Sequence, residues 1–322
     1  MANEILGIHH VTAITDDPQQ NIDFYVGVLG LRLIKKTVNF DVPDTYHLYY
    51  GDNLGTPGTI LTFFSWPNSP KGRRGTGQVT TTSFVVPENA LAYWQERLTQ
   101  HGIQVEGPTT RFDEQVLTFT DHEGLGIELV AHRGAAGRTG WTTGPVPIEY
   151  AVRGIHAVTL SVTHKERTIS LLTQTLGFRL ISETGNRARY EVGAGDNAGS
   201  GAFVDLLDLP HGTRGVEAIG SVHHVAWRTP DDEQELAWRG VLVSAGMGVT
   251  PQLDRTYFHS IYFREPNGVL FEIATDAPGF AIDEAPAELG SHLKLPPWLE
   301  AQRPQLERDL PPVHTPVGTQ GR

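Results

Sequence analysis

The chain has 322 residues, 39% hydrophobic and 19% charged, which is long enough for about two domains with buried cores. It contains no cysteine, which excludes disulfide frameworks, thiolate nucleophiles and cysteine-ligated zinc or iron–sulfur centres. The formal charge of −12 argues against nucleic acid or an anionic membrane as the main partner. No apolar run approaches the ~20 residues of a membrane span, and the N-terminal segment lacks the layout of a secretory signal. We therefore expect a cytoplasmic protein.

In chain order, the sequence predicts four units of about 55 residues, each with one strand, one helix and three further strands. Asp and Pro residues mark the expected helix starts, and glycines follow the expected helix ends. A Gly- and Pro-rich link is expected over 132–152, and a proline-rich C-terminal tail over 276–322. We place the four βαβββ modules at residues 7–65, 78–131, 154–208 and 221–275.

The two halves of the chain repeat each other. Residues 7–39 match residues 154–186 at one constant offset, starting with Gly-Ile-His in both segments. Later in each half, the matched pairs are Arg111 with Arg255, Phe119 with Phe263, Gly124 with Gly268 and Glu128 with Glu272. The sequence therefore predicts an N-terminal pair of modules over 1–145 and a C-terminal pair over 146–275.

Adjacent histidines open the first and fourth modules. Because neighbouring residues of a strand point to opposite faces, one histidine of each pair can face a shared cavity. His9 aligns with His156, whereas His10 aligns with Ala157, so His10 holds the position that differs between the modules. The matching histidine of the fourth module is His224.

A second equivalent position lies four residues after a glycine near the end of each module. It is occupied by Thr62, Glu128, Asp205 and Glu272 in the four modules. Modules one and four together thus supply His10, His224 and Glu272, whereas modules two and three supply carboxylates without a matching histidine. We predict one metal per chain, which requires module one to pack with module four and module two with module three. Glu128 and Asp205 are expected to be buried or rim carboxylates instead of ligands of a second metal.

Two histidines and one carboxylate on one face leave the other coordination positions open. This arrangement suits Fe(II), and Zn²⁺ and Mn²⁺ are also compatible with the donors. A single histidine on a strand is more often a hydrogen-bonded core residue than a ligand. The repetition of the pair in two homologous modules, together with a matching Glu272, favours a metal.

The motifs GIHHVT, SVHHVAW and GVLFEIATD, set in four βαβββ modules, resemble the vicinal oxygen chelate superfamily of glyoxalases, bleomycin-resistance proteins and extradiol dioxygenases. Within it, the chain looks most like the hydroquinone and chlorohydroquinone ring-cleaving dioxygenases, over nearly its whole length. The resemblance implies an α+β fold with two barrel-like halves, and the same three metal ligands.

The resemblance also implies active-site roles for five further residues. These are His9, Thr12, His223, Arg255 and Tyr262. Tyr262 aligns with Thr118, so this tyrosine is peculiar to the module that carries the metal. Arg255 aligns with Arg111 of a module without a predicted metal. Both an active-site role and a structural ion pair therefore remain open for Arg255.

The function expected from this resemblance is Fe(II)-dependent cleavage of a hydroquinone- or catechol-type ring by O₂. The alternatives are a glyoxalase-like isomerase or thiol transferase, and a non-catalytic protein that binds a quinone or drug. An isomerase of this type usually needs a fourth protein ligand where Thr62 stands, and a simple binder needs no metal triad. A small aromatic diol and O₂ are thus the expected partners, and a homodimer is the expectation from base rates alone.

Overall fold

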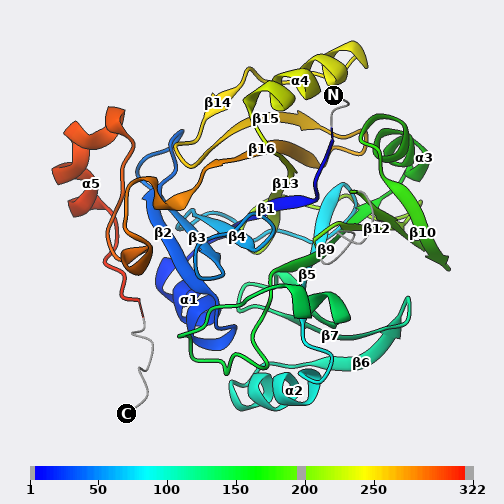
Figure 1. The fold of residues 1–322 in the computed structure, drawn as a ribbon, viewed down its shortest axis with the longest axis horizontal. Helices are drawn as coiled ribbons and strands as arrows, with labels where there is room; N and C mark the ends of the chain where they lie inside the picture. Colours follow the sequence, from blue (N-terminus) through cyan, green and yellow to red (C-terminus); the bar gives the residue numbers. More distant parts are fainter. Residues whose placement is uncertain (1–3, 194–200, 316–322) are drawn as a thin grey trace.

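The computed structural model describes residues 4–193 and 201–315, which form two eight-stranded sheets. One sheet has the strand order β14-β15-β16-β13-β1-β4-β3-β2, and the other β10-β11-β12-β9-β5-β8-β7-β6. Each sheet therefore combines one module from each half of the sequence (Figure 1). The predicted α+β fold is confirmed, as is the pairing of module one with four and of module two with three.

The first sheet is built from modules one and four. Module one contains β1 (Ile8–Thr15), α1 (Pro18–Ile22), the π-helical turn η1 (Asp23–Val28), β2 (Arg32–Val38), β3 (Tyr46–Gly51) and β4 (Ile60–Ser65). Module four contains β13 (Val222–Thr229), α4 (Asp232–Ser244), β14 (Leu253–Asp254), β15 (Phe258–Arg264) and β16 (Leu270–Pro278). Asp17 and Asp231 cap α1 and α4 by accepting backbone N–H bonds, as the acidic helix starts predicted.

The second sheet is built from modules two and three. Module two contains β5 (Gln78–Val86), α2 (Leu91–Gln100), β6 (Glu106–Arg111), β7 (Glu114–Thr120) and β8 (Gly126–Ala131), followed by the 3₁₀ turn η2 (Arg133–Gly137). Module three contains β9 (Ile155–Val162), α3 (Lys165–Ser170), η3 (Leu171–Thr175), β10 (Arg179–Thr184), β11 (Arg187–Glu191) and β12 (Phe203–Asp208). The predicted boundary between the two halves at residue 145 stays a prediction. Each sheet contains one module from each half, so the sheets mark no boundary there.

The first strands of the modules lie at the centre of both sheets. β1 pairs antiparallel with β13 in one sheet, and β5 pairs antiparallel with β9 in the other. All eight residues of β1 are buried, and so are all eight of β9. Apolar side chains of these strands pack in the core, so their buried polar side chains must find partners inside the protein. This is why histidines and threonines on central strands are informative about function.

The C-terminal tail runs along the edge of the first sheet, beside β2 (Figure 1). It contains the short 3₁₀ turns η5 (Phe280–Ile282), η6 (Pro286–Glu288) and η7 (Pro297–Gln302) and the helix α5 (Arg303–Asp309). The fully buried Lys35 of β2 holds it through ion pairs of Nζ with Asp283 Oδ1 at 2.6 Å and Glu284 Oε2 at 2.5 Å. Among the described helices, none has the length and apolar character needed to cross a bilayer.

Candidate metal centre

Three side chains from the first sheet converge on one point. His10 comes from β1, His224 from β13 and Glu272 from β16. Glu272 Oε2 lies 3.3 Å from His10 Nε2 and 2.9 Å from His224 Nε2, and the two Nε2 atoms are 3.3 Å apart. All three side chains are buried, with Glu272 fully so. The structure therefore brings together the three residues that the repeats single out.

The arrangement of the three donor side chains suits the ligands of a divalent cation better than a hydrogen-bonded cluster. Glu272 Oε1 accepts a hydrogen bond from Ser260 Oγ, but the buried Oε2 makes no hydrogen bond of acceptable geometry within the described residues. An unsatisfied buried carboxylate oxygen is costly, and a cation between it and two imidazoles would remove that cost. Two imidazole nitrogens and a carboxylate oxygen are suitable ligands for Fe(II), Zn²⁺ and Mn²⁺.

The electrostatics keep the donors in the protonation states that a metal requires. Burial alone would raise the pKa of Glu272, but the imidazoles of His10 and His224 hold it well below its usual range. Burial lowers the pKa of His224, although the Glu272 carboxylate opposes this shift. At neutral pH, the site thus offers an anionic carboxylate and a neutral imidazole at His224.

The preceding histidines, His9 and His223, support the two ligand histidines from behind. The register of β1 against β13 shifts at His9 and again at His223, leaving each without a partner across the ladder, as in a β-bulge. The strict alternation of faces assumed from the sequence is therefore broken at these positions. His9 Nδ1 lies 2.8 Å from His10 Nδ1, and His223 Nδ1 lies 2.7 Å from His224 Nδ1.

These Nδ1 contacts match what metal-binding imidazoles need. A histidine that binds a metal through Nε2 carries its proton on Nδ1 and donates it to an outer acceptor. Burial, followed by the neighbouring His10, lowers the pKa of His9. Burial and the neighbouring His224 lower the pKa of His223 to about 3. Both outer imidazoles are thus neutral at pH 7 and can accept through Nδ1.

Replacing His9 with phenylalanine (H9F) removes the acceptor behind His10. We expect affinity for Fe(II) to fall about 10- to 100-fold, because outer-shell partners orient ligands and tune their basicity. A chelator-competition titration under anaerobic conditions measures this. The matched control is H156F at the aligned position of the other sheet, which should lower stability and leave iron affinity unchanged. Equal iron affinities for H9F and wild type would contradict this role for His9.

A pocket beside the three donors contains two of the five predicted active-site residues, Arg255 and Tyr262. Arg255 Nε lies 3.3 Å from Tyr262 Oη, and Arg255 Nη1 lies 3.2 Å from the exposed Asp41. The ring centroids of Tyr262 and His224 are 5.7 Å apart. Burial, followed by the charge of Glu272, raises the pKa of Tyr262, so its phenol stays protonated at neutral pH. His9, Thr12 and His223 lie behind the pocket lining, and their roles stay predictions.

Several pocket residues were not predicted from the sequence. These are Asn39, Asp41, His47, Tyr49 and Phe64. They come from β3, β4 and the loop between β2 and β3. The signal available in the sequence was the alternation of His47 and Tyr49 along β3, which places both side chains on one face.

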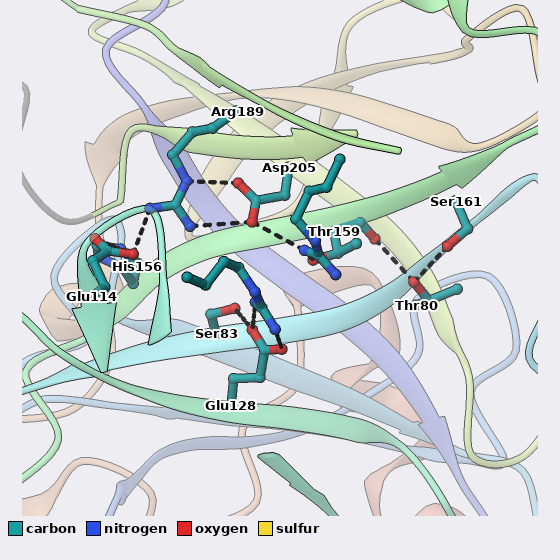
Figure 2. A network of polar contacts seen from close by, with 11 residues as sticks. Thr80, Ser83, Glu114, Glu128, His156, Thr159, Ser161, Arg189 and Asp205 are labelled. Carbon is teal, nitrogen blue, oxygen red and sulfur yellow. Dashed lines mark hydrogen bonds and ion pairs between the residues drawn. The ribbon is translucent and has the colours of Figure 1, made fainter. Parts of the chain in front are cut away.

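The equivalent carboxylates of the second sheet are paired with arginines. Arg111 makes two 2.8 Å hydrogen bonds to Glu128, which also accepts from Ser83. Asp205 accepts from Arg189 and Arg187, with an Arg189 Nε to Oδ1 distance of 2.7 Å. Figure 2 shows these carboxylates and the guanidinium groups that face them. Guanidinium charges thus neutralise Glu128 and Asp205, which are buried carboxylates as the sequence predicts.

Glu114, His132 and His156 form a second His/Glu cluster near this network. Glu114 accepts from His156 Nε2 at 2.8 Å and from Arg189 Nη1 at 2.5 Å (Figure 2). His132 Nδ1 accepts the backbone N–H of Gly134, so its Nε2 carries the proton and has no lone pair for a metal. This cluster is therefore a hydrogen-bonded network around the Glu114 carboxylate.

Comparisons with known proteins agree with this architecture. The model of the Glyoxalase/Bleomycin resistance protein/Dioxygenase superfamily matches residues 7–129 and 154–273. The Bacillus subtilis protein named "Putative ring-cleaving dioxygenase MhqO" is 46% identical over 97% of this chain and 98% of its own length. The Sphingobium indicum chlorohydroquinone/hydroquinone 1,2-dioxygenase is 34% identical over 96% of this chain and 97% of its own.

Solved structures give the same result. The crystal structure of a Bacillus subtilis protein described as a "putative dioxygenase" superposes with a TM-score of 0.92 at 45% identity, covering 98% of this chain and 99% of that one. Maize glyoxalase I shares the fold, with a TM-score of 0.60 at 17% identity over 84% of this chain and 92% of that one. The two eight-stranded sheets and the family match over both halves show that this chain belongs to the glyoxalase/bleomycin resistance/dioxygenase superfamily.

Proposed function

We propose that the protein is an Fe(II)-dependent dioxygenase that cleaves a hydroquinone- or catechol-type aromatic ring. The observation that carries the proposal is the convergence of His10, His224 and Glu272 beside a pocket with aromatic walls. The relatives named as ring-cleaving and hydroquinone dioxygenases, which align over almost the whole chain, support the same reaction class.

In this proposal, His10 and His224 hold the ion through Nε2 and Glu272 through Oε2. When bound, Fe(II) supplies the redox chemistry that lets O₂ react with an electron-rich ring. The protein's contribution is to bind and orient that ring. Phe40, Phe64 and Phe258 supply apolar walls for it.

Arg255 and Tyr262 add polar groups to the same pocket. The Arg255 guanidinium is a fixed positive charge that stabilises negative charge developing on a substrate oxygen. The neutral phenol of Tyr262 can donate a hydrogen bond or a proton to such an oxygen. Because Arg255 already contacts Tyr262 Oη and Asp41, its guanidinium is held in place before substrate binds.

The position of Thr62 favours this function over a glyoxalase-like isomerase. Thr62 occupies the first-module position that corresponds to Glu272, where a fourth protein ligand would stand. A neutral hydroxyl is a much weaker ligand than a carboxylate for a divalent cation, so His10, His224 and Glu272 alone would hold the ion and leave room for substrate or O₂.

Oxygen uptake by the iron-loaded protein tests the proposal. Protein reconstituted with Fe(II) without oxygen is mixed with hydroquinone, catechol or their substituted forms, and O₂ consumption and ring-opened product are measured. We expect one O₂ consumed per ring opened with at least one of these diols. Bound iron without any uptake would remove the dioxygenase function and leave isomerase and binding assays as the next tests.

A further inference from the structure

The first sheet has an approximate two-fold relation between modules one and four that places Thr62 opposite Glu272. Thr62 of β4 pairs with Thr12 of the parallel strand β1, and Glu272 of β16 pairs with Ala226 of the parallel strand β13. β1 and β13 then pair antiparallel at the centre of the sheet. The hydroxyl of Thr62 is therefore the first-module counterpart of the Glu272 carboxylate.

A chain of hydrogen bonds reaches Thr62 from the pocket wall. Tyr49 Oη lies 2.9 Å from His47 Nδ1, and His47 Nε2 lies 2.8 Å from Thr62 Oγ1. Thr62 Oγ1 in turn lies 2.9 Å from Thr12 Oγ1. Thr12, Tyr49 and Thr62 are buried, and the partly buried His47 lines the same pocket as His10 and His224.

The donor and acceptor roles along this series of hydrogen bonds follow from Tyr49, its first member. Burial raises the pKa of Tyr49, so its phenol is neutral and must donate its proton. His47 Nδ1 is the partner that the structure gives to Tyr49 Oη among the described residues, so Nδ1 accepts. The neutral imidazole then carries its proton on Nε2 and donates it to Thr62.

Burial, more than any neighbouring group, keeps the His47 imidazole neutral. Burial lowers its pKa first, and His10, His224 and Arg255 lower it further, whereas Glu272 alone opposes them. The His47 ring also packs against those of Tyr49 and Phe64 in tilted arrangements, with ring centroids 4.0 and 4.4 Å away, which restricts its rotation. Because Thr62 accepts from His47, its hydroxyl proton can be donated either to Thr12 Oγ1 or to a bound ligand.

We propose that Thr62, oriented by His47 and Tyr49, donates a hydrogen bond to a phenolic oxygen of a substrate bound beside the candidate metal site. This inference rests on the proposed function. Thr62 is then the group that contacts the ligand, and His47 and Tyr49 are positioning residues. A donor at this place favours a phenolate ligand, since hydrogen bonds to charged oxygens are stronger than those between neutral groups.

Hydroquinone binding in the absence of oxygen tests this role separately from turnover. Fe(II)-loaded wild type, T62V, T62S, Y49F and Y50F are titrated with hydroquinone, and iron content is measured for each. We expect T62V to bind about 10-fold more weakly or worse, because one hydrogen bond to a charged group is lost. T62S restores the hydroxyl and should bind within about 3-fold of wild type.

Comparing Y49F with Y50F separates the effect of the hydrogen bond to His47 from the effect of losing a buried tyrosine hydroxyl. Y49F removes the donor to His47 and should weaken binding by about 3-fold, with ¹⁵N NMR of the Zn²⁺-loaded protein showing a changed His47 tautomer. Y50F makes the same change one residue away, where Tyr50 Oη donates to Asn21, and should leave binding unchanged.

Equal hydroquinone affinity of T62V and wild type, or failure of T62S to restore it, would overturn the inference. A wild type that binds hydroquinone without consuming O₂ would remove the proposed function, while the comparison of T62V with T62S would still decide the role of Thr62. A wild type that holds iron and binds no phenol would overturn both.

Discussion

The E272A variant should lose stoichiometric Fe(II) and all diol-dependent oxygen uptake, while keeping its fold. Glu272 supplies the sole anionic donor of the three, and its Oε2 has no other hydrogen-bond partner among the described residues. Removing it leaves two imidazoles as donors, which bind a divalent cation far more weakly than the full set of three. Iron content after anaerobic reconstitution, with O₂ uptake on the same samples, measures the effect.

The second sheet provides a matched control for this variant. E128A removes the aligned carboxylate, which pairs with Arg111 and Ser83 instead of histidines. It should retain one iron per chain and lose stability, because Arg111 is left without its partner. Full iron occupancy in E272A, or loss of iron in E128A, would contradict the assignment of the metal to the first sheet.

The R189M variant should be less stable by about 3–5 kcal/mol, the usual effect of removing one partner from a buried ion pair. Arg189 is 4% exposed and pairs with both Glu114 and Asp205, so the variant leaves two buried carboxylates with fewer partners. Its guanidinium also lies over the rings of Phe112 and Phe203, at 4.8 and 5.1 Å. Chemical denaturation measures the free energy of unfolding.

A surface pair gives the comparison for R189M. Arg179 pairs with Glu191 through a side chain that is 58% exposed, so R179M should cost no more than about 1 kcal/mol. Both variants should keep wild-type iron content, since neither residue contacts the first-sheet donors. Equal stability losses in R189M and R179M would show that the buried network contributes no more than a surface pair.

The same network predicts a pH dependence of stability. Burial would raise the pKa of Glu114, but hydrogen bonding and charge from His156, then Arg189, lower it to about 2. A carboxyl with a lowered pKa contributes stability above its ordinary pKa of 4.5 and loses it as the pH falls toward 2. Wild-type stability should therefore decline across that range, and the decline should be shallower in R189M. Identical profiles for the two proteins would contradict this origin.

Much of the fold and the donor set could be predicted because the chain repeats itself. Aligning modules isolates His10 and His224 as positions where modules two and three carry no histidine. The pairing of the modules then follows, because the three predicted donors can meet only if modules one and four share a sheet. Each step uses local pattern and internal comparison, which a single sequence supplies.

The remaining features depend on contacts between distant segments. The register shifts at His9 and His223 arise from the pairing of two strands and leave no mark in local sequence. The contacts of Arg255 with Asp41 and of Lys35 with Asp283 join residues from different modules or from the tail. His47 and Tyr49 become informative only once β3 is placed beside β4.

Locating iron by anomalous scattering in crystals of the reconstituted protein tests the central claim most directly. We expect one iron peak per chain, bounded by His10 Nε2, His224 Nε2 and Glu272 Oε2 at about 2.0–2.2 Å, the usual range for nitrogen and oxygen ligands of such ions. A peak at Glu114, His132 and His156 instead, or no peak near Glu272, would contradict it.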